Sequence, residues 1–178
     1  MRIHLARHTE TNYNEINVIN SDPGVDVHLT ERGIKQAEKL ARSLADTYLE
    51  VCFVSDLPRT RQTASIVLNQ RSVPIVADTL INEYITGFEG RNIQEWREAL
   101  EKQENPWPKA FNNGESMESA FNRAEEFIEF LRRSPYDSVL VITHGFFVEA
   151  LYGISQGFSG ESAMGHLVPQ GEYIEISI

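Results

Sequence analysis

Arginine and histidine residues follow three apolar segments of the chain, where buried strands are expected to end. Arg7 and His8 follow the first segment, Arg59 follows the second, and His144 with Gly145 follows the third. In an open α/β sheet, ligands bind beyond the carboxyl ends of the strands, so we expect these side chains to gather there. Guanidinium groups bind phosphate oxygens in a planar fork, and imidazole is a competent nucleophile. This combination favours phosphoryl-transfer chemistry.

His8 is the residue best suited to be the nucleophile. The neighbouring positive charge of Arg7 favours neutral imidazole over imidazolium, which leaves one ring nitrogen with a lone pair. A lone histidine at a strand end is more often structural, and Arg59 alone would suit a solvated helix. The occurrence of these residue types at successive strand ends is what favours a phosphate site. Such a site also needs an acid that protonates the leaving oxygen.

The spacing of apolar residues predicts the elements that position this site. Strands are expected over residues 2–7, 51–55, 74–77, 138–143 and 173–178. Helices are expected from Thr30 with Ile34 on the apolar stripe, over 58–68, from Ser116, and over 145–152. This alternation predicts an α/β fold, a three-layer sandwich whose mostly parallel central sheet is flanked by helices. A polar active-site loop is expected over 12–27, whereas 79–107 has no clear period.

The composition is typical of one folded domain, which we expect to span residues 1–178. The chain has 41% hydrophobic residues and a formal net charge of -10. This charge argues against nucleic acid or an anionic membrane as the main partner and favours small solutes. It also repels phosphorylated substrates, so a local arginine and histidine cluster must supply the attraction. The single cysteine, Cys52, and the lack of a long apolar run predict a cytoplasmic enzyme.

Short motifs extend these observations along nearly the whole chain. They are Leu5–Asn14, Leu29–Gly33, Ser55–Arg59, Glu83 before Gly87–Gly90, Gly114–Ser116 and Thr143–Gly145. In these motifs and in their order, the chain resembles the histidine phosphatase, or phosphoglycerate mutase-like, superfamily. The resemblance implies a phosphoglycerate mutase-like fold and an enzyme that needs no metal or other cofactor.

The resemblance also assigns roles to individual residues. It implies that His8 is the phosphorylated nucleophile and that Glu83 is the proton donor, with Glu89 in the same loop as a rival acid. The rest of the implied phosphate pocket consists of Arg7, Arg59 and His144. Implied substrate-binding residues are Asn14, Thr11 and Gly145. Thr9 stands where the family usually has glycine, which predicts altered substrate fit and retained activity.

We therefore predict a histidine acid phosphatase-type phosphomonoesterase that passes the phosphoryl group through a covalent phosphohistidine on His8. The expected substrate is a small phosphorylated metabolite, with a phosphoprotein as an alternative. A phosphoglycerate mutase is a rival, but mutases carry a longer insert with paired arginines. Between Glu83 and Ser116 the chain offers only the bases Arg91, Arg97, Lys102 and Lys109.

A non-catalytic relative and a metal hydrolase are two further alternatives. A non-catalytic relative would bind a phosphorylated ligand without turnover, which the intact set of motif residues disfavours. A metal hydrolase built from His4, His8 and His144 is disfavoured because no two histidines share a helical face. Aromatic residues near the motifs are expected to pack more than to bind ligand. They are Tyr84, Phe88, Trp96, Trp107, Phe146 and Phe147.

Overall fold

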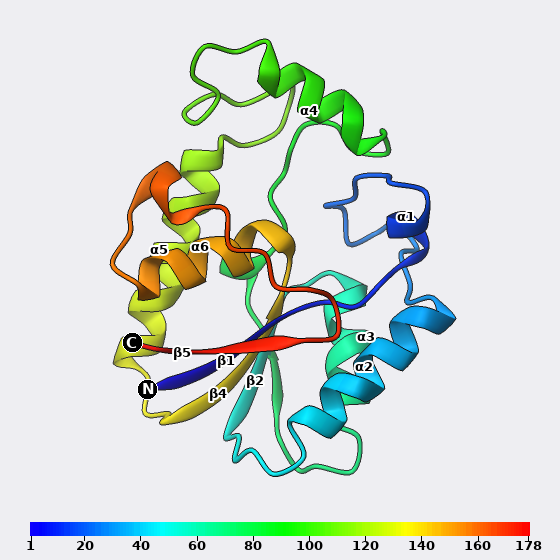
Figure 1. Cartoon of the computed structure of the whole chain (residues 1–178), viewed down its shortest axis with the longest axis vertical. Helices are drawn as coiled ribbons and strands as arrows, with labels where there is room; N and C mark the ends of the chain where they lie inside the picture. Colours follow the sequence, from blue (N-terminus) through cyan, green and yellow to red (C-terminus); the bar gives the residue numbers. More distant parts are fainter.

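A five-stranded sheet runs through the middle of the computed structural model, which describes residues 1–178 (Figure 1). The strands are β1 (Arg2–Arg7), β2 (Val51–Val54), β3 (Ile75–Ala77), β4 (Ser138–Thr143) and β5 (Tyr173–Ser177). Their order in the sheet is β3-β2-β4-β1-β5, and only β5 runs antiparallel to its neighbour. The Met1 ammonium group donates a hydrogen bond to the Ile178 carbonyl (3.1 Å), so the two termini are adjacent.

Helices cover both faces of the sheet. They are α1 (Asn12–Glu15), α2 (Glu31–Ser43), α3 (Pro58–Val67), α4 (Ile93–Glu101), α5 (Met117–Arg133) and α6 (Gly145–Ser155), with 3-10 turns η1 (Thr79–Ile81) and η2 (Gly160–Ala163). Because strand side chains alternate between faces, Leu5 joins the apolar cluster beneath α5 and α6, whereas Ala6 joins the cluster beneath α2 and α3. The predicted three-layer α/β sandwich is confirmed, as Figure 1 shows.

The expected helix starts are also present. The Thr30 hydroxyl caps α2 by accepting from the Gly33 amide (3.0 Å), and Ser116 caps α5 in the same way. The prediction that Ile34 belongs to the buried stripe of α2 is wrong, because its side chain is 41% exposed. The backbone at Gly33 makes the close contact instead, since a Cβ there would lie 2.0 Å from the Glu10 carbonyl oxygen.

Two segments without a clear pattern contain short helices. The loop expected over 12–27 begins with α1, a single helical turn. The region 79–107 contains η1 and α4, and α4 lies at one end of the molecule, away from the sheet (Figure 1). The expectation that this region has no clear period is wrong for α4, because Ile93, Trp96 and Leu100 recur at helical spacing, although no residue of α4 is fully buried. None of the helices has the length and apolar character that crossing a bilayer requires.

Candidate active site

The structure brings three of the predicted residues, His8, Arg59 and His144, together beyond the carboxyl ends of β1 and β4. The His8 amide donates to the Thr143 carbonyl (2.9 Å), and the rings of His8 and His144 lie 5.1 Å apart between centroids. Arg59, from the first turn of α3, contacts both rings. Its Nε donates to His8 Nε2 (3.2 Å), and its Nη2 donates to His144 Nδ1 (3.2 Å).

The hydrogen bonds of His8 define its tautomer. Nδ1 lies 2.8 Å from the Thr9 carbonyl oxygen, which only accepts, so Nδ1 carries the proton. Nε2 accepts from Arg59 and therefore holds the lone pair. Burial, together with the charges of Arg59 and Arg7, keeps the pKa of His8 well below its ordinary value. His8 is thus a neutral imidazole with Nε2 as its nucleophilic atom.

His144 is neutral for similar reasons and is held by a hydroxyl group. Nδ1 accepts from Arg59, so Nε2 carries the proton and donates to Ser55 Oγ (2.8 Å). Burial, followed by the charge of Arg59, holds the pKa of His144 well below its ordinary value. The helix α6 begins directly after His144, which places the positive end of the helix dipole beside the site.

Arg59 is fixed by Asn20, a residue that lies outside the sequence motifs. Its Nη1 donates to Asn20 Oδ1 (2.9 Å), and its Nη2 donates to the Asn20 carbonyl (3.0 Å). Burial lowers the pKa of Arg59 to about 10, so the guanidinium remains charged at neutral pH. Asn20 lies in a polar loop and carries no local signal of this role. Ser55 was also missed, although it opens the motif that contains Arg59.

Glu83 and Glu89 occupy different environments. Glu83 Oε2 lies 3.7 Å from His144 Nδ1, and Glu83 Oε1 accepts from the Tyr84 amide (3.0 Å). Glu89 instead accepts from Asn20 Nδ2 (2.9 Å) and from the amide and hydroxyl of Ser21. Glu89 therefore braces the loop that holds Arg59, whereas Glu83 adjoins the pair of histidines.

Glu83 has the protonation behaviour that a proton donor needs. Burial raises its pKa, although Arg59, the Tyr84 amide, Arg7 and Arg123 each oppose this effect. Its distance to His144 would suit an ion pair, but the raised pKa of the acid and the lowered pKa of the imidazole both oppose an ionised pair. The side chain is 21% exposed, so a ligand can reach the carboxyl group.

Arg7 contributes a buried donor that the protein leaves unpaired. Its Nε has no hydrogen-bond partner. Gly145 lies against the guanidinium, since a Cβ at that position would be 3.6 Å from Arg7 Cζ. An unpaired buried N–H is costly, and an anionic oxygen would satisfy it. Two imidazoles of lowered pKa, two arginines and a carboxyl group of raised pKa together form a site suited to a phosphoryl group.

Residues 3–177 match the histidine phosphatase superfamily (branch 1). The chain belongs to this superfamily. It is 30% identical to "Phosphoserine phosphatase 1" of Hydrogenobacter thermophilus over 159 residues, covering 85% of this chain and 74% of the relative. It is also 30% identical to "Probable phosphoglycerate mutase GpmB" of Escherichia coli over 156 residues, covering 82% and 70%.

A solved structure supports the same assignment. The α-ribazole phosphatase from Shigella flexneri superposes with a TM-score of 0.87 at 30% sequence identity. The match covers 100% of this chain and 91% of the relative. The phosphoglycerate mutase-like fold expected from the sequence is therefore confirmed.

Thr11 and Asn14 build the loop beyond β1. The Thr11 hydroxyl accepts from the Asn14 amide (3.2 Å), and Asn14 Oδ1 accepts from the Thr11 amide (3.1 Å). Asn14 Oδ1 also accepts from Gln170 Nε2 (3.0 Å). These bonds form a capping box at the start of α1. A direct role of Thr11, Asn14 or Gly145 in substrate binding stays a prediction.

Thr9 fits the loop that follows β1 without a strained backbone. It is not among the residues with positive φ, and its side chain is fully buried. Its amide donates to Thr63 Oγ1 (3.2 Å), and the two hydroxyls lie 3.3 Å apart. Thr63 belongs to α3, so Thr9 ties the end of β1 to the helix that carries Arg59.

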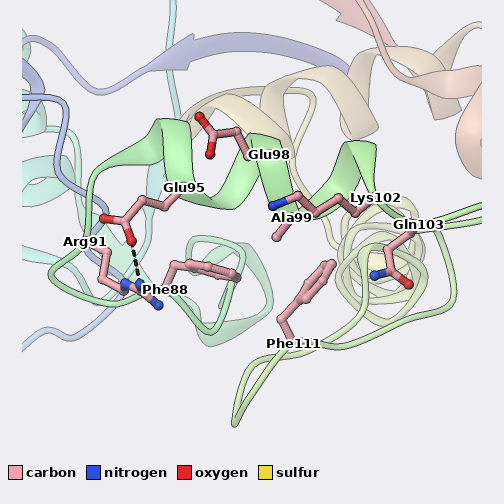
Figure 2. A pocket seen from close by; sticks show the side chains of 8 residues that line it. All are labelled: Phe88, Arg91, Glu95, Glu98, Ala99, Lys102, Gln103 and Phe111. Carbon is pink, nitrogen blue, oxygen red and sulfur yellow. Dashed lines mark ion pairs between the residues drawn. The ribbon is translucent and has the colours of Figure 1, made fainter.

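A separate cavity of about 350 Å³ lies beside α4 (Figure 2). His8, Arg59 and His144 do not line it. At this cavity, Arg91 forms an ion pair with Glu95 and lies 5.2 Å from the centre of the Phe88 ring.

The expectation that the aromatic residues pack is confirmed for Tyr84, Phe88 and Phe147, which are buried. The remaining three pack against the core and are Trp96, Trp107 and Phe146.

His4 does not join the site. It lies on β1 with its Nδ1 3.8 Å from Glu175 Oε2 of β5. No group of three or more His, Cys, Asp or Glu side chains is arranged to hold a metal ion. The arrangement of His4, His8 and His144 that a metal hydrolase would need is therefore not formed.

Proposed function

We propose that this protein is a phosphatase that hydrolyses small phosphomonoesters through a covalent phosphohistidine on His8. The observation that carries the proposal is the position of His8 Nε2. This atom holds the lone pair and lies 3.2 Å from Arg59 Nε. A phosphoryl group that arrives at this atom meets a guanidinium placed to donate to its oxygens. Membership of the histidine phosphatase superfamily supports the same chemistry.

In the first step, His8 Nε2 attacks phosphorus and the bond from phosphorus to the leaving oxygen breaks. Arg59 and Arg7 stabilise the charge on the transferring oxygens. Glu83 gives its proton to the leaving oxygen, which departs as an alcohol. The raised pKa of Glu83 keeps this proton available. The products of the step are phosphohistidine and ionised Glu83.

In the second step, water attacks the phosphohistidine. Ionised Glu83 accepts a proton from the water, a new phosphorus–oxygen bond forms, and the phosphorus–nitrogen bond breaks. The electron pair returns to His8 Nε2, and inorganic phosphate leaves. Glu83 ends the cycle protonated and His8 ends it neutral, so no cofactor is consumed.

Water is the proposed acceptor because the short stretch between Glu83 and Ser116 lacks the longer insert with paired arginines that mutases carry. Arg91, from the short stretch after Glu83, is paired with Glu95. Relatives named as a phosphoserine phosphatase and an α-ribazole phosphatase support a small phosphorylated metabolite as substrate. A phosphoprotein is the alternative substrate class. One domain over residues 1–178 and a cytoplasmic location also stay predictions.

The proposal is tested by replacing the nucleophile. His8→Asn is expected to lower hydrolysis of p-nitrophenyl phosphate by about 10³-fold or more and to abolish trapping of acid-labile, base-stable phosphate on the protein. His28→Asn serves as the control, because His28 is an exposed surface residue that pairs only with Asp26. Equal hydrolysis by the wild type and His8→Asn would rule out the mechanism. Unchanged activity after EDTA treatment is expected.

A further inference from the structure

The backbone segment that carries Glu83 is held from one side by Arg123 of α5. The Nη1 atom of Arg123 donates to the carbonyls of Thr79 (3.4 Å), Leu80 (3.0 Å) and Asn82 (3.1 Å). Asn82 directly precedes Glu83. One guanidinium nitrogen thus binds three carbonyls of the backbone that precedes Glu83, the proposed proton donor.

The other side of the segment is held by Glu115, the partner of Arg123. Glu115 accepts from Arg123 Nε (3.2 Å) and Nη2 (2.5 Å). Its Oε1 also accepts from the Ile85 amide (3.0 Å), and the Glu115 amide donates to the Ile85 carbonyl (2.8 Å). A single ion pair therefore anchors the residues before and after Glu83.

The ion pair is partly buried and is packed against the helix that follows His144. The side chains of Arg123 and Glu115 are only 23% and 15% exposed. The Arg123 guanidinium lies 4.6 Å from the centre of the Phe147 ring, and Phe147 is fully buried on α6. Charge-assisted hydrogen bonds are stronger and more directional in such surroundings than at an exposed surface.

Glu83 depends on this support because its own carboxyl group has few contacts. Its only hydrogen bond is to the adjacent Tyr84 amide, and His144 Nδ1 lies beyond hydrogen-bond distance at 3.7 Å. The position of the carboxyl group therefore follows from the backbone of residues 82–85. A shift of about 1 Å in a reacting group is enough to cost about 10²-fold in rate.

We propose that the Arg123–Glu115 pair is a positioning device that fixes the proton donor Glu83 against the leaving oxygen. Neither residue touches the substrate in this role. The inference rests on the proposed function, since it assigns the pair to the proton-transfer part of that reaction. It predicts that weakening the pair lowers kcat/KM for substrates whose leaving group needs a proton. Substrates whose leaving group needs no proton should keep their kcat/KM.

Two substrates separate this role from general support of the fold. An alkyl phosphate such as glycerol 3-phosphate releases a strongly basic alkoxide unless it is protonated, whereas p-nitrophenyl phosphate releases a stable phenolate. The quantity to measure is kcat/KM for the alkyl phosphate divided by kcat/KM for p-nitrophenyl phosphate. Both values come from one preparation, so partial unfolding cancels from the ratio.

Arg123→Met and Glu115→Gln are each expected to lower this ratio by about tenfold, in the same direction as Glu83→Gln. Arg123→Lys keeps the charge but loses the planar fork, so its ratio is expected to lie between those of Arg123→Met and the wild type. Arg132→Met is the matched control, because Arg132 lies on the same helix and pairs with Glu129 at the surface. Its ratio is expected to equal that of the wild type.

The outcomes distinguish this inference from the proposed function. If Glu83→Gln lowers the ratio while Arg123→Met and Glu115→Gln leave it unchanged, the positioning role is overturned and the proton-donor role stands. If Glu83→Gln itself leaves the ratio unchanged, the proposed proton donor is wrong and the positioning inference falls with it.

Discussion

At the scale of single residues, the protonation states of the two histidines depend on a few fixed acceptors. The Thr9 carbonyl holds the proton on His8 Nδ1, and Ser55 Oγ accepts the proton of His144 Nε2. Arg59 donates to the remaining nitrogen of each ring. The chemistry of the site is therefore set by groups that do not themselves react.

Removing the Ser55 hydroxyl is expected to weaken both catalysis and stability. Ser55→Ala leaves His144 Nε2–H buried without an acceptor, which costs about 1–3 kcal/mol in the free energy of unfolding. It also frees the ring to change tautomer, with a loss of about tenfold or more in kcat/KM. Urea denaturation and steady-state kinetics measure the two effects. Ser65→Ala, on the exposed side of α3, is expected to change neither, and similar results for the two variants would contradict the role of Ser55.

The pH dependence of kcat/KM follows from the two pKa directions at the site. His8 must be unprotonated to attack, and its lowered pKa places the acid limb below about pH 6.5, the ordinary histidine value. Glu83 must be protonated to donate, and its raised pKa places the alkaline limb above about pH 4.3, the ordinary glutamate value. Activity thus falls as pH rises through the pKa of Glu83.

This alkaline limb is expected for an alkyl phosphate and is expected to be weak or absent for p-nitrophenyl phosphate. The second ionisation of the phosphate group affects both substrates and so does not produce the difference. Profiles of kcat/KM between about pH 4 and pH 9 provide the measurement. Identical alkaline limbs for the two substrates would exclude Glu83 as the proton donor.

At the scale of elements, the close approach of α2 to the loop after β1 supports the site. A Cβ at Gly33 would meet the Glu10 carbonyl oxygen at 2.0 Å, and the Thr30 amide donates to that same carbonyl (3.1 Å). Gly33→Ala must therefore displace backbone, with an expected loss of about 2–3 kcal/mol of stability and reduced kcat/KM. Thermal unfolding checks this, and Gly24→Ala in an exposed loop is the control. A stability loss no greater than that of the control would contradict the packing argument.

The elements also differ in how well the sequence alone predicts them. The segment Ser138–Thr143, with its apolar run Val139–Ile142, predicted β4 with the bounds that the structure has, because a strand buried on both faces is mostly apolar. The convergence of His8, Arg59 and His144 also followed from strand ends alone. The helix α4 was missed, because its apolar residues Ile93, Trp96 and Leu100 recur over only 9 helical residues and none of them is fully buried.

Residues that act across long sequence separations were beyond prediction. Asn20 binds Arg59 across 39 positions, Ser55 binds His144 across 89, and Arg123 reaches the Asn82 carbonyl across 41. Each is a common polar residue in an ordinary local context, and its role exists only after the sheet has assembled. The sequence motifs therefore include the residues that we propose to react, but they omit most of the residues that position them.

At the scale of the whole molecule, the net charge of -10 opposes the local field of Arg7 and Arg59. Salt screens exposed charges over a Debye length of about 10 Å at 0.1 M but screens buried contacts much less. The long-range repulsion of a phosphate dianion should therefore weaken with salt while its attraction to buried Arg59 persists.

Raising NaCl from about 0.02 M to about 0.2 M is accordingly expected to increase kcat/KM for p-nitrophenyl phosphate, by about twofold. Sucrose at equal osmolality is the control, because it changes water activity without screening charge. The effect should appear mainly in KM, since the reaction of bound substrate takes place among buried groups. A steady fall of kcat/KM with salt would show instead that the arginine cluster attracts substrate from well outside the site, and that its field outweighs the acidic surface.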